Sequence, residues 1–140
     1  MQEFSPEKDE PDFTVFPTDN VNAVVISGLE IRSMCAHHLA PFFGKCTIAY
    51  YPRKKIAGLS KFQRVLDYLC KQPTEQETLN EKVMRYLDKK LEPLAIVVIM
   101  EAQHTCMIVR GVGISGSQTK TVATRGAGED IDGLLTSIKI

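Results

Sequence analysis

Residues 74–101, TEQETLNEKVMRYLDKKLEPLAIVVIME, join a helical pattern directly to a strand pattern. The apolar stripe of the helix consists of Leu79, Val83, Leu87 and Leu91. Pro93 ends that pattern, since a proline excludes helical geometry from the residue before it. The run 94–101 is rich in β-branched residues and predicts a strand buried on both faces. A long amphipathic helix followed by a buried strand favours a fold in which helices cover a sheet.

The flanking segments extend this pattern in both directions. Upstream, 62–69 has helical spacing with Ser60 as its expected N-cap, and Thr74 followed by Glu77 has the form of a capping box. Strands are expected over 21–34, 45–51, 94–101, 103–111 and 119–124, and a short helix over 130–138. Gly28 is expected to mark a bulge. The order β-β-α-α-β-β predicts an α+β fold: an antiparallel sheet with two helices on one face. Because few residues blunt the sheet edges, we expect strands to pair between subunits.

The length of 140 residues fits a single domain. Residues 1–18 are expected to form a mobile N-terminal arm and 19–140 the single catalytic domain. Seventeen basic and 17 acidic residues cancel, which gives no general attraction to nucleic acid or to an anionic membrane. The longest apolar run, 94–100, is too short to span a bilayer, and the acidic residues 1–13 form no apolar signal core. We therefore expect a soluble cytoplasmic protein.

Two short segments contain all three histidines of the chain. Cys35 and His38 have a spacing that lets both side chains converge on one ion, and His104 and Cys106 would share a face of a strand. Two thiolates and one imidazole suffice for a catalytic zinc site that keeps one position for water. His37 and His104 would then stand beside the metal and move protons. The alternative is a set of packed thiols and hydrogen-bonded histidines. The remaining thiols, Cys46 and Cys70, lie in apolar patterns and are expected in the core.

Other polar residues have no role in the expected core: Ser60, Lys61, Arg64, Gln76, Glu77 and Arg110. A helix N-terminus beside Lys61 can hold an anion, and the two arginines can add donors for a polyphosphate. Structural alternatives remain open, because Ser60 can simply cap its helix and Glu77 can close a capping box.

Several of these residues fall within longer motifs that resemble the GTP cyclohydrolase I family. The matching segments are Ser33-Met-Cys-Ala-His-His38, Pro41-Phe-Phe-Gly-Lys45, Gly58-Leu-Ser-Lys61, Arg64, Gln76-Glu77, Glu101-Ala-Gln-His-Thr-Cys-Met107, Arg110-Gly111 and the Ser/Thr-rich Ser117 to Thr124. They follow one another in order from about residue 30 to residue 125, so the resemblance covers most of the chain.

The resemblance implies a tunnelling fold (T-fold), in which subunits join their sheets into a β-barrel ring, either a pentamer or a decamer. It implies Zn²⁺ on Cys35, His38 and Cys106, and GTP bound between subunits. Glu77, helped by Gln76, would recognise guanine. The ribose and triphosphate would contact Ser60, Lys61, Arg64 and Arg110.

The implied reaction is zinc-dependent hydrolysis of GTP at guanine C8. It gives formate and 7,8-dihydroneopterin triphosphate, as the first step of folate, pterin or 7-deazapurine biosynthesis, with His37 and His104 moving protons. The family usually has Glu where this chain has Ala36. It also has a long helical segment before the first strand, which bears on whether two rings stack. Ala36 motivates one alternative, a diverged T-fold zinc hydrolase or deformylase with another substrate. A second alternative, from a different class, is a non-catalytic ring-forming binding protein.

Overall fold

The computed structural model of the chain describes residues 10–36, 39–104 and 118–139. Its main sheet is antiparallel and four-stranded, in the order β2-β3-β5-β6. These strands are β2 (Val24–Met34), β3 (Pro41–Tyr51), β5 (Ala95–His104) and β6 (Thr119–Arg125). Two short strands, β1 (Val15–Pro17) and β4 (Lys55–Ala57), form a separate pair.

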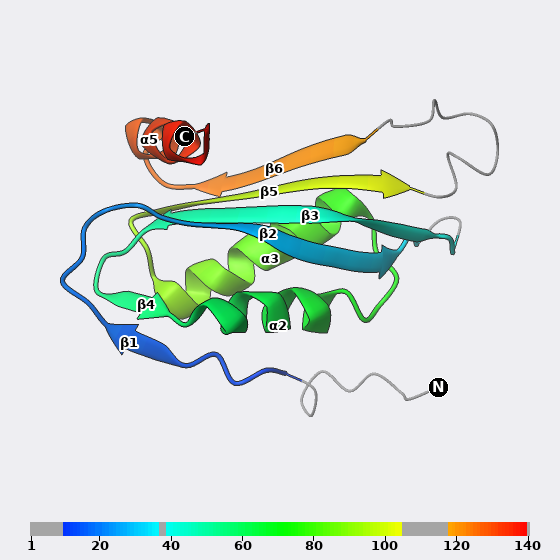
Figure 1. Ribbon diagram of the computed structural model, residues 1–140, viewed down its shortest axis with the longest axis horizontal. Coiled ribbons are helices and arrows are strands. Elements are labelled where there is room, and N and C mark those ends of the chain that lie inside the picture. Colours follow the sequence, from blue (N-terminus) through cyan, green and yellow to red (C-terminus); the bar gives the residue numbers. More distant parts are fainter. Residues whose placement is uncertain (1–9, 37–38, 105–117, 140) are drawn as a thin grey trace.

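Helices α2 (Leu59–Leu69) and α3 (Gln76–Leu91) lie on one face of the main sheet (Figure 1). The predicted stripe of α3 is buried along its whole length, and so are residues 95–100 of β5. Cys46 and Cys70 are buried thiols, as predicted. The prediction of an α+β fold with two helices on one face of an antiparallel sheet is therefore confirmed.

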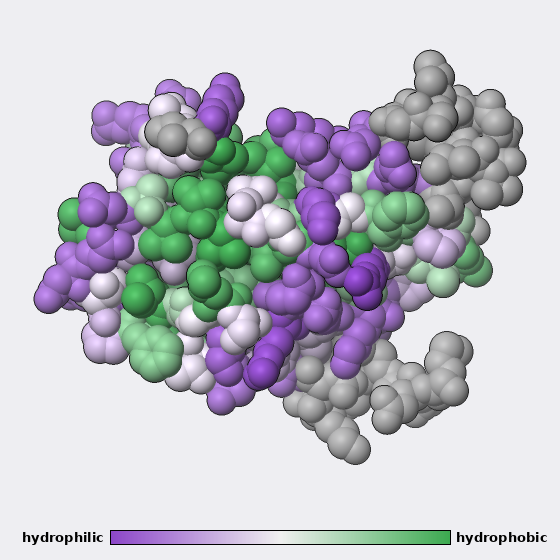
Figure 2. Space-filling model, in the orientation of Figure 1, coloured by the Kyte–Doolittle hydropathy of each residue, from purple (hydrophilic) through white to green (hydrophobic). Residues whose placement is uncertain are grey.

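A third helix, α5 (Gly128–Lys139), covers the opposite face of the sheet (Figure 1). The sequence predicts this helix but not the surface on which it packs. Its Leu134 is fully buried against Ala49, Ala95, Val97 and Ile99. Only part of the face is covered, because Val25, Phe43 and Val122 share that face and remain exposed. Figure 2 shows apolar side chains gathered below α5 on the visible side.

Both predicted helix caps are wrong. Helix α2 begins at Leu59 with Gly58 as its N-cap, so Ser60 lies inside the first turn. Helix α3 has Glu75 as its N-cap, and neither helix has a side-chain cap hydrogen bond. Thr74 is one residue too early to cap α3 because its backbone is paired with the chain beyond β2: its N–H donates to Met34 O (2.9 Å) and its carbonyl accepts from the N–H of Ala36 (3.2 Å).

Two predicted strand limits also differ from the structure. Strand β3 begins at Pro41, where the sequence predicts a loop up to Gly44. Strand β5 continues without a break through His104, so the second strand predicted from Gln103 is the end of the first. The rest of that prediction, 105–111, lies outside the described residues. The predicted bulge is confirmed: the register shifts between Ile26 and Leu29, and Gly28 has φ 75°.

The segment expected to be a mobile arm packs on the domain from Glu10 onwards. Phe13 is buried, with its ring edge-on to Phe62 at 5.6 Å and to Tyr86 at 6.5 Å. The Tyr86 hydroxyl donates to Glu10 (2.8 Å), and β1 pairs with β4. Residues 1–9 lie outside the described part of the chain. No helix among the described residues is long and apolar enough to cross a membrane.

Candidate active site

Three segments that are distant in sequence meet at one end of the sheet, on the right of Figure 1: the end of β2, the end of β5 and the start of α3. The register pairs Met34 with Pro41 and Phe42 with His104, so β2 and β5 end on either side of the start of β3. Cys35 follows β2 and forms a parallel bridge with Thr74, just before α3. The fold therefore brings the Cys35 segment and the His104 segment to the same place.

Cys35 lies in a tight turn and is only 8% exposed. Its N–H donates to Ala40 O (2.8 Å), and its carbonyl accepts from the N–H of Leu39 (2.8 Å). Of the three predicted zinc ligands, Cys35 is described, whereas His38 and Cys106 lie outside the described residues, as does the predicted proton carrier His37. Within the described part of the chain, no three His, Cys, Asp or Glu side chains converge as a metal site would require.

Two neighbours hold the ring of His104, one against its face and one at its edge. Its ring stacks on Phe42, with the two centroids 4.7 Å apart and the planes within 8°. Its Nε2 lies 2.8 Å from Oε1 of Gln76. Burial lowers the pKa of His104, and the nearby Glu77 carboxylate opposes this by raising it.

Gln76 and Glu77 open α3 but have opposite surroundings. Gln76 is 1% exposed, whereas the side chain of Glu77 faces solvent in the first helical turn. Glu77 directly follows Gln76, whose Oε1 lies 2.8 Å from His104 Nε2, and the Glu77 carboxylate acts to raise the pKa of that ring. Because the N–H of Thr74 donates to Met34 O (2.9 Å), Glu77 does not close the predicted capping box with Thr74.

Ser60 and Lys61 lie at the other end of the molecule, at the start of α2. The end of α2 reaches the β2 terminus, where Ser33 Oγ donates to Cys70 O (3.3 Å). A helix rises ~1.5 Å per residue, so Ser60 is roughly 15 Å along the axis from Cys70. Within the described part of the chain, neither Lys61 nor Arg64 is paired with a carboxylate. Arg110 lies outside the described residues. One chain thus keeps Ser60 and Lys61 apart from Cys35 and His104.

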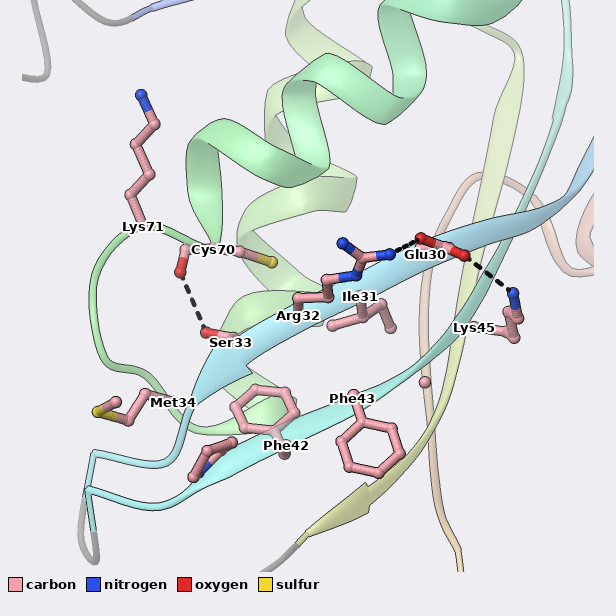
Figure 3. A pocket seen from close by; sticks show the side chains of 12 residues that line it. Glu30, Ile31, Arg32, Ser33, Met34, Phe42, Phe43, Lys45, Cys70 and Lys71 are labelled. Carbon is pink, nitrogen blue, oxygen red and sulfur yellow. Dashed lines mark hydrogen bonds and ion pairs between the residues drawn. The ribbon is translucent and has the colours of Figure 1, made fainter.

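A hollow of about 760 Å³ runs along the end of β2 and the start of β3 (Figure 3). It is lined by Glu30, Ile31, Arg32, Ser33, Met34, Pro41, Phe42, Phe43, Gly44, Lys45, Cys70 and Lys71. The volume lies within the ~300–1,000 Å³ typical of small-molecule sites. Arg32 (2.5 Å) and Lys45 (3.6 Å) both pair with the single carboxylate of Glu30, so these three side chains keep one net positive charge. The hollow adjoins Cys35, but those predicted substrate-binding residues that the structure describes do not line it.

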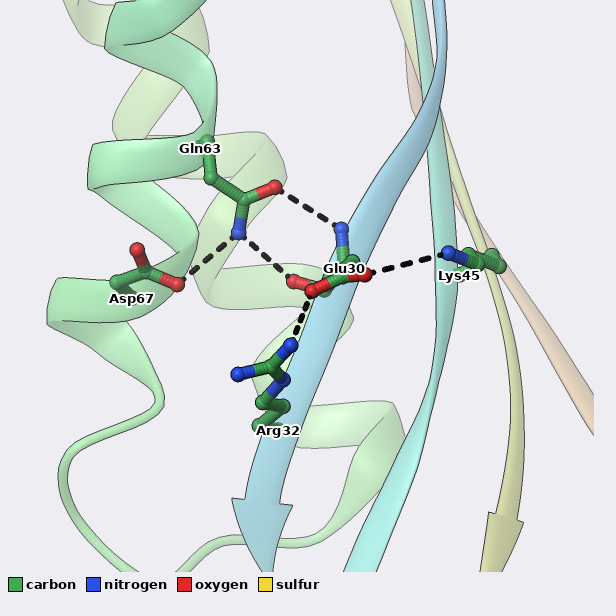
Figure 4. A network of polar contacts seen from close by, with 5 residues as sticks. All are labelled: Glu30, Arg32, Lys45, Gln63 and Asp67. Atoms are coloured by element: carbon green, nitrogen blue, oxygen red, sulfur yellow. Dashed lines mark hydrogen bonds and ion pairs between the residues drawn. The ribbon is translucent and has the colours of Figure 1, made fainter.

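The outer edge of β2 is covered from within the chain beside this hollow (Figure 4). The Glu30 N–H donates to Gln63 Oε1, and Gln63 Nε2 donates to Glu30 O, both at 2.9 Å. Further along this edge, the backbone N–H of Thr74 donates to Met34 O, and the carbonyl of Thr74 accepts from the N–H of Ala36 just beyond β2. The expectation that few devices blunt the edge is therefore wrong for the second half of β2, because a glutamine amide imitates a neighbouring strand there.

Three residues of this region were not predicted as functional: Phe42, Thr119 and Thr121. Phe42 supports the His104 ring, and both threonines accept hydrogen bonds from Gln76. Phe42 does lie in the Pro41–Lys45 motif, which gave it a signal in the sequence. The threonines lie in the Ser/Thr-rich segment but more than 40 residues from Gln76, so spacing could not connect them.

Comparison with known proteins gives a consistent result. A family model described as GTP cyclohydrolase I matches residues 3–133. The chain is 42% identical over 126 residues to a GTP cyclohydrolase 1 from Listeria welshimeri, covering 89% of this chain and 67% of that protein. It is 45% identical over 114 residues to the protein of that name from Brevibacillus brevis, covering 81% and 61%. Among solved structures, an archaeosine synthase QueF-Like protein in its apo form has the same fold, with a TM-score of 0.62 at 15% identity over 75% of this chain and 94% of the other.

Proposed function

The chain belongs to the GTP cyclohydrolase I family, and on that premise we propose that it hydrolyses GTP at guanine C8, releasing formate and forming 7,8-dihydroneopterin triphosphate. The observation that carries the proposal is the meeting of Cys35, Glu77 and His104 at one end of the sheet. The reaction consumes one water and needs a metal-activated nucleophile, a proton carrier and a group that recognises guanine. Each of the three residues supplies one of these.

We assign a zinc site to Cys35, His38 and Cys106. The donor set fits the metal, because two thiols and an imidazole are ordinary zinc ligands and Cys35 is buried where the metal-binding segments would meet. When bound, Zn²⁺ would lower the pKa of a coordinated water toward ~7 and so supply the nucleophile. The backbone hydrogen bonds of Cys35 with Leu39 and Ala40 would hold the Cys35 ligand in position.

His104 and His37 would move protons during ring opening. For His104 the geometry supports this role, since Phe42 and Gln76 fix the ring in one orientation. A proton carrier must lie within hydrogen-bond reach of the reacting atoms and keep that position. His37 follows Cys35 by two residues, and its role rests on the family resemblance.

The Glu77 carboxylate is suited to recognising guanine. It is exposed, belongs to no cap, and lies near His104. A carboxylate accepts hydrogen bonds from the N1–H and N2–H groups of guanine, whereas adenine offers no such pair on that edge. This preference would select GTP over ATP.

We further propose that the site is completed by a second subunit. Ser60 and Lys61 are roughly 15 Å along α2 from the end that meets β2, too far for one chain to place them beside its own Cys35. A neighbouring copy can bring its Ser60, Lys61 and Arg64 to this site in a homo-oligomeric ring, pentameric or decameric. Among the described residues, no further strand pairs with the first half of β2 or with the outer edge of β6, so these edges could pair between subunits.

The test is to incubate zinc-loaded protein with GTP and to measure formate and, after oxidation, a fluorescent pterin. Glu77→Gln should retain zinc and raise the KM for GTP by at least tenfold, because the carboxylate pair becomes a mismatched amide. Glu81→Gln, one helical turn further on, is the matched control and should not change KM. Cys106→Ala should lose both zinc and activity. No pterin from the zinc-bound protein would refute the proposal, and activity on formylated compounds instead would favour the hydrolase suggested by Ala36.

A further inference from the structure

The amide of Gln76 is enclosed between β5 and β6 at the start of α3. Its Nε2 donates to two backbone carbonyls, Met100 O (3.2 Å) and Thr119 O (2.9 Å), and lies 3.2 Å from the hydroxyl of Thr121. The residue is 1% exposed, so water does not compete for these bonds.

These partners determine which end of the amide faces His104. Backbone carbonyls can only accept, so the NH₂ group must face Met100 and Thr119. A flipped amide would set its oxygen against two carbonyl oxygens that cannot donate, and only the Thr121 hydroxyl could then supply it with a hydrogen. Oε1 is therefore the atom that faces the histidine, at 2.8 Å from Nε2.

An acceptor at that position requires a donor on the ring. The amide oxygen carries no hydrogen, so His104 Nε2 must carry one. A neutral imidazole has one N–H, and Nδ1 is then the nitrogen with the free lone pair. Stacking on Phe42 at 4.7 Å holds the ring plane while the hydrogen bond holds its edge.

We propose that Gln76 is a positioning residue that keeps His104 in the Nε2–H tautomer and leaves Nδ1 as the proton acceptor. Gln76 acts through His104, and its amide is used inside the protein rather than on the base of the substrate. The functional part of this inference rests on the proposed role of His104, whereas the tautomer itself can be observed without any reaction.

The decisive measurement is the tautomer of His104 in the zinc-loaded full-length protein. Long-range ¹H–¹⁵N spectra of histidine-labelled protein distinguish Nε2–H from Nδ1–H, and His104→Asn assigns the signals among the three histidines. We expect Nε2–H in the wild type. In Gln76→Glu, a protonated carboxyl group can donate its O–H to Thr119 O and accept from the ring with its other oxygen, so this tautomer should be preserved. In Gln76→Met, which is similar in length but lacks the acceptor, the signals should shift to a mixture.

Kinetics provide a second test with a matched control. Gln76→Met should lower kcat for GTP by about 10- to 100-fold with KM changed less than about threefold, since positioned acid–base groups contribute ~10²–10⁴-fold. Gln72→Met makes the same chemical change at an exposed glutamine and should change neither constant.

An Nδ1–H signal for His104 in the wild type would overturn the proposal, even if Gln76→Met fails to fold. So would a Gln76→Met variant that raises KM but keeps kcat, because that result assigns Gln76 to base recognition. Absence of GTP turnover by the zinc-bound wild type refutes the proposed function instead, and the tautomer measurement still decides the role of Gln76.

Discussion

Replacement of Gly44 by alanine should destabilise the protein and disturb His104 together. A Cβ at this position would lie 2.0 Å from Glu101 O and 2.6 Å from Ala102 Cα on the paired strand. Carbon atoms normally approach no closer than ~3.5 Å, so β3 and β5 would have to separate locally by roughly 1 Å or more. Both clashing atoms belong to the backbone, so no side-chain rotation relieves the clash.

The expected cost has two parts. Overpacking of a rigid contact costs about 1–3 kcal/mol, and the loss of one or two ladder hydrogen bonds costs about 1 kcal/mol each. The restriction that alanine places on the unfolded chain offsets about 0.5 kcal/mol. Gly44→Ala should therefore lower the free energy of unfolding by about 2–4 kcal/mol. This corresponds to a fall in Tm of about 8–15 °C at this chain length.

The assay is urea and thermal unfolding of Gly44→Ala beside Gly128→Ala. Gly128 begins α5, and a Cβ added there would have no neighbouring atom within 4 Å. Its replacement by alanine should therefore leave the free energy of unfolding unchanged or raise it slightly. Because Gly44 pairs with Ala102, two residues from His104, kcat should fall as well. A Gly44→Ala protein within about 0.5 kcal/mol of the wild type would show that the close approach of β3 and β5 is not a constraint.

Three further predictions concern other described residues. Both amide atoms of the buried Asn80 lack a hydrogen-bond partner among the described residues. Asn80→Leu should therefore raise the free energy of unfolding, measured in urea, by about 1–3 kcal/mol. A lower free energy of unfolding in this variant would mean that the amide has a partner. Burial raises the pKa of Cys46 to about 12 and of Cys70 to about 11, from an ordinary 9.0. As the pH rises, the thiols of the unfolded chain therefore lose their protons before those of the folded chain. Below pH 9 this contribution to stability is complete, and between pH 9 and 10 the free energy of unfolding should fall by about 1 kcal/mol per thiol. In Cys70→Ala the free energy of unfolding should fall less steeply with pH. Gln63→Leu should expose the β2 edge and speed hydrogen exchange of the Glu30 amide at least tenfold; unchanged exchange would contradict the bonding seen in Figure 4.

Sequence periodicity predicted the elements whose burial depends on their own pattern. The stripe from Leu79 to Leu91 and the buried run of β5 are long enough to define a helix and a strand. Prediction from the sequence failed where contacts with residues distant in the chain determine the local structure. Thr74 has the composition of a cap, but pairing with Met34 and Ala36 gives its backbone another task. Strands β1 and β4 are three residues each, too short for any periodicity to show.

For the candidate site, too, the sequence identified some residues and could not identify the role of others. Residue type and motif pointed to Cys35, Glu77 and His104, because thiol, carboxylate and imidazole carry chemistry wherever they lie. Motif alone could not show that Gln76 is buried, since its partners come from residues 24 to 45 positions away. Whether a glutamine meets a substrate or its own protein depends on tertiary contacts that have no local signature.

The bridge between Cys35 and Thr74 couples the end of β2 to the start of α3 through backbone hydrogen bonds. A ligand that restrains Cys35 also restrains Thr74, two residues before the helix that carries Gln76 and three before Glu77. Free-energy coupling between two binding events is reciprocal, so order gained on one side of the bridge strengthens binding on the other by the same factor. Metal affinity measured with and without a guanine nucleotide would therefore report how stiff this bridge is.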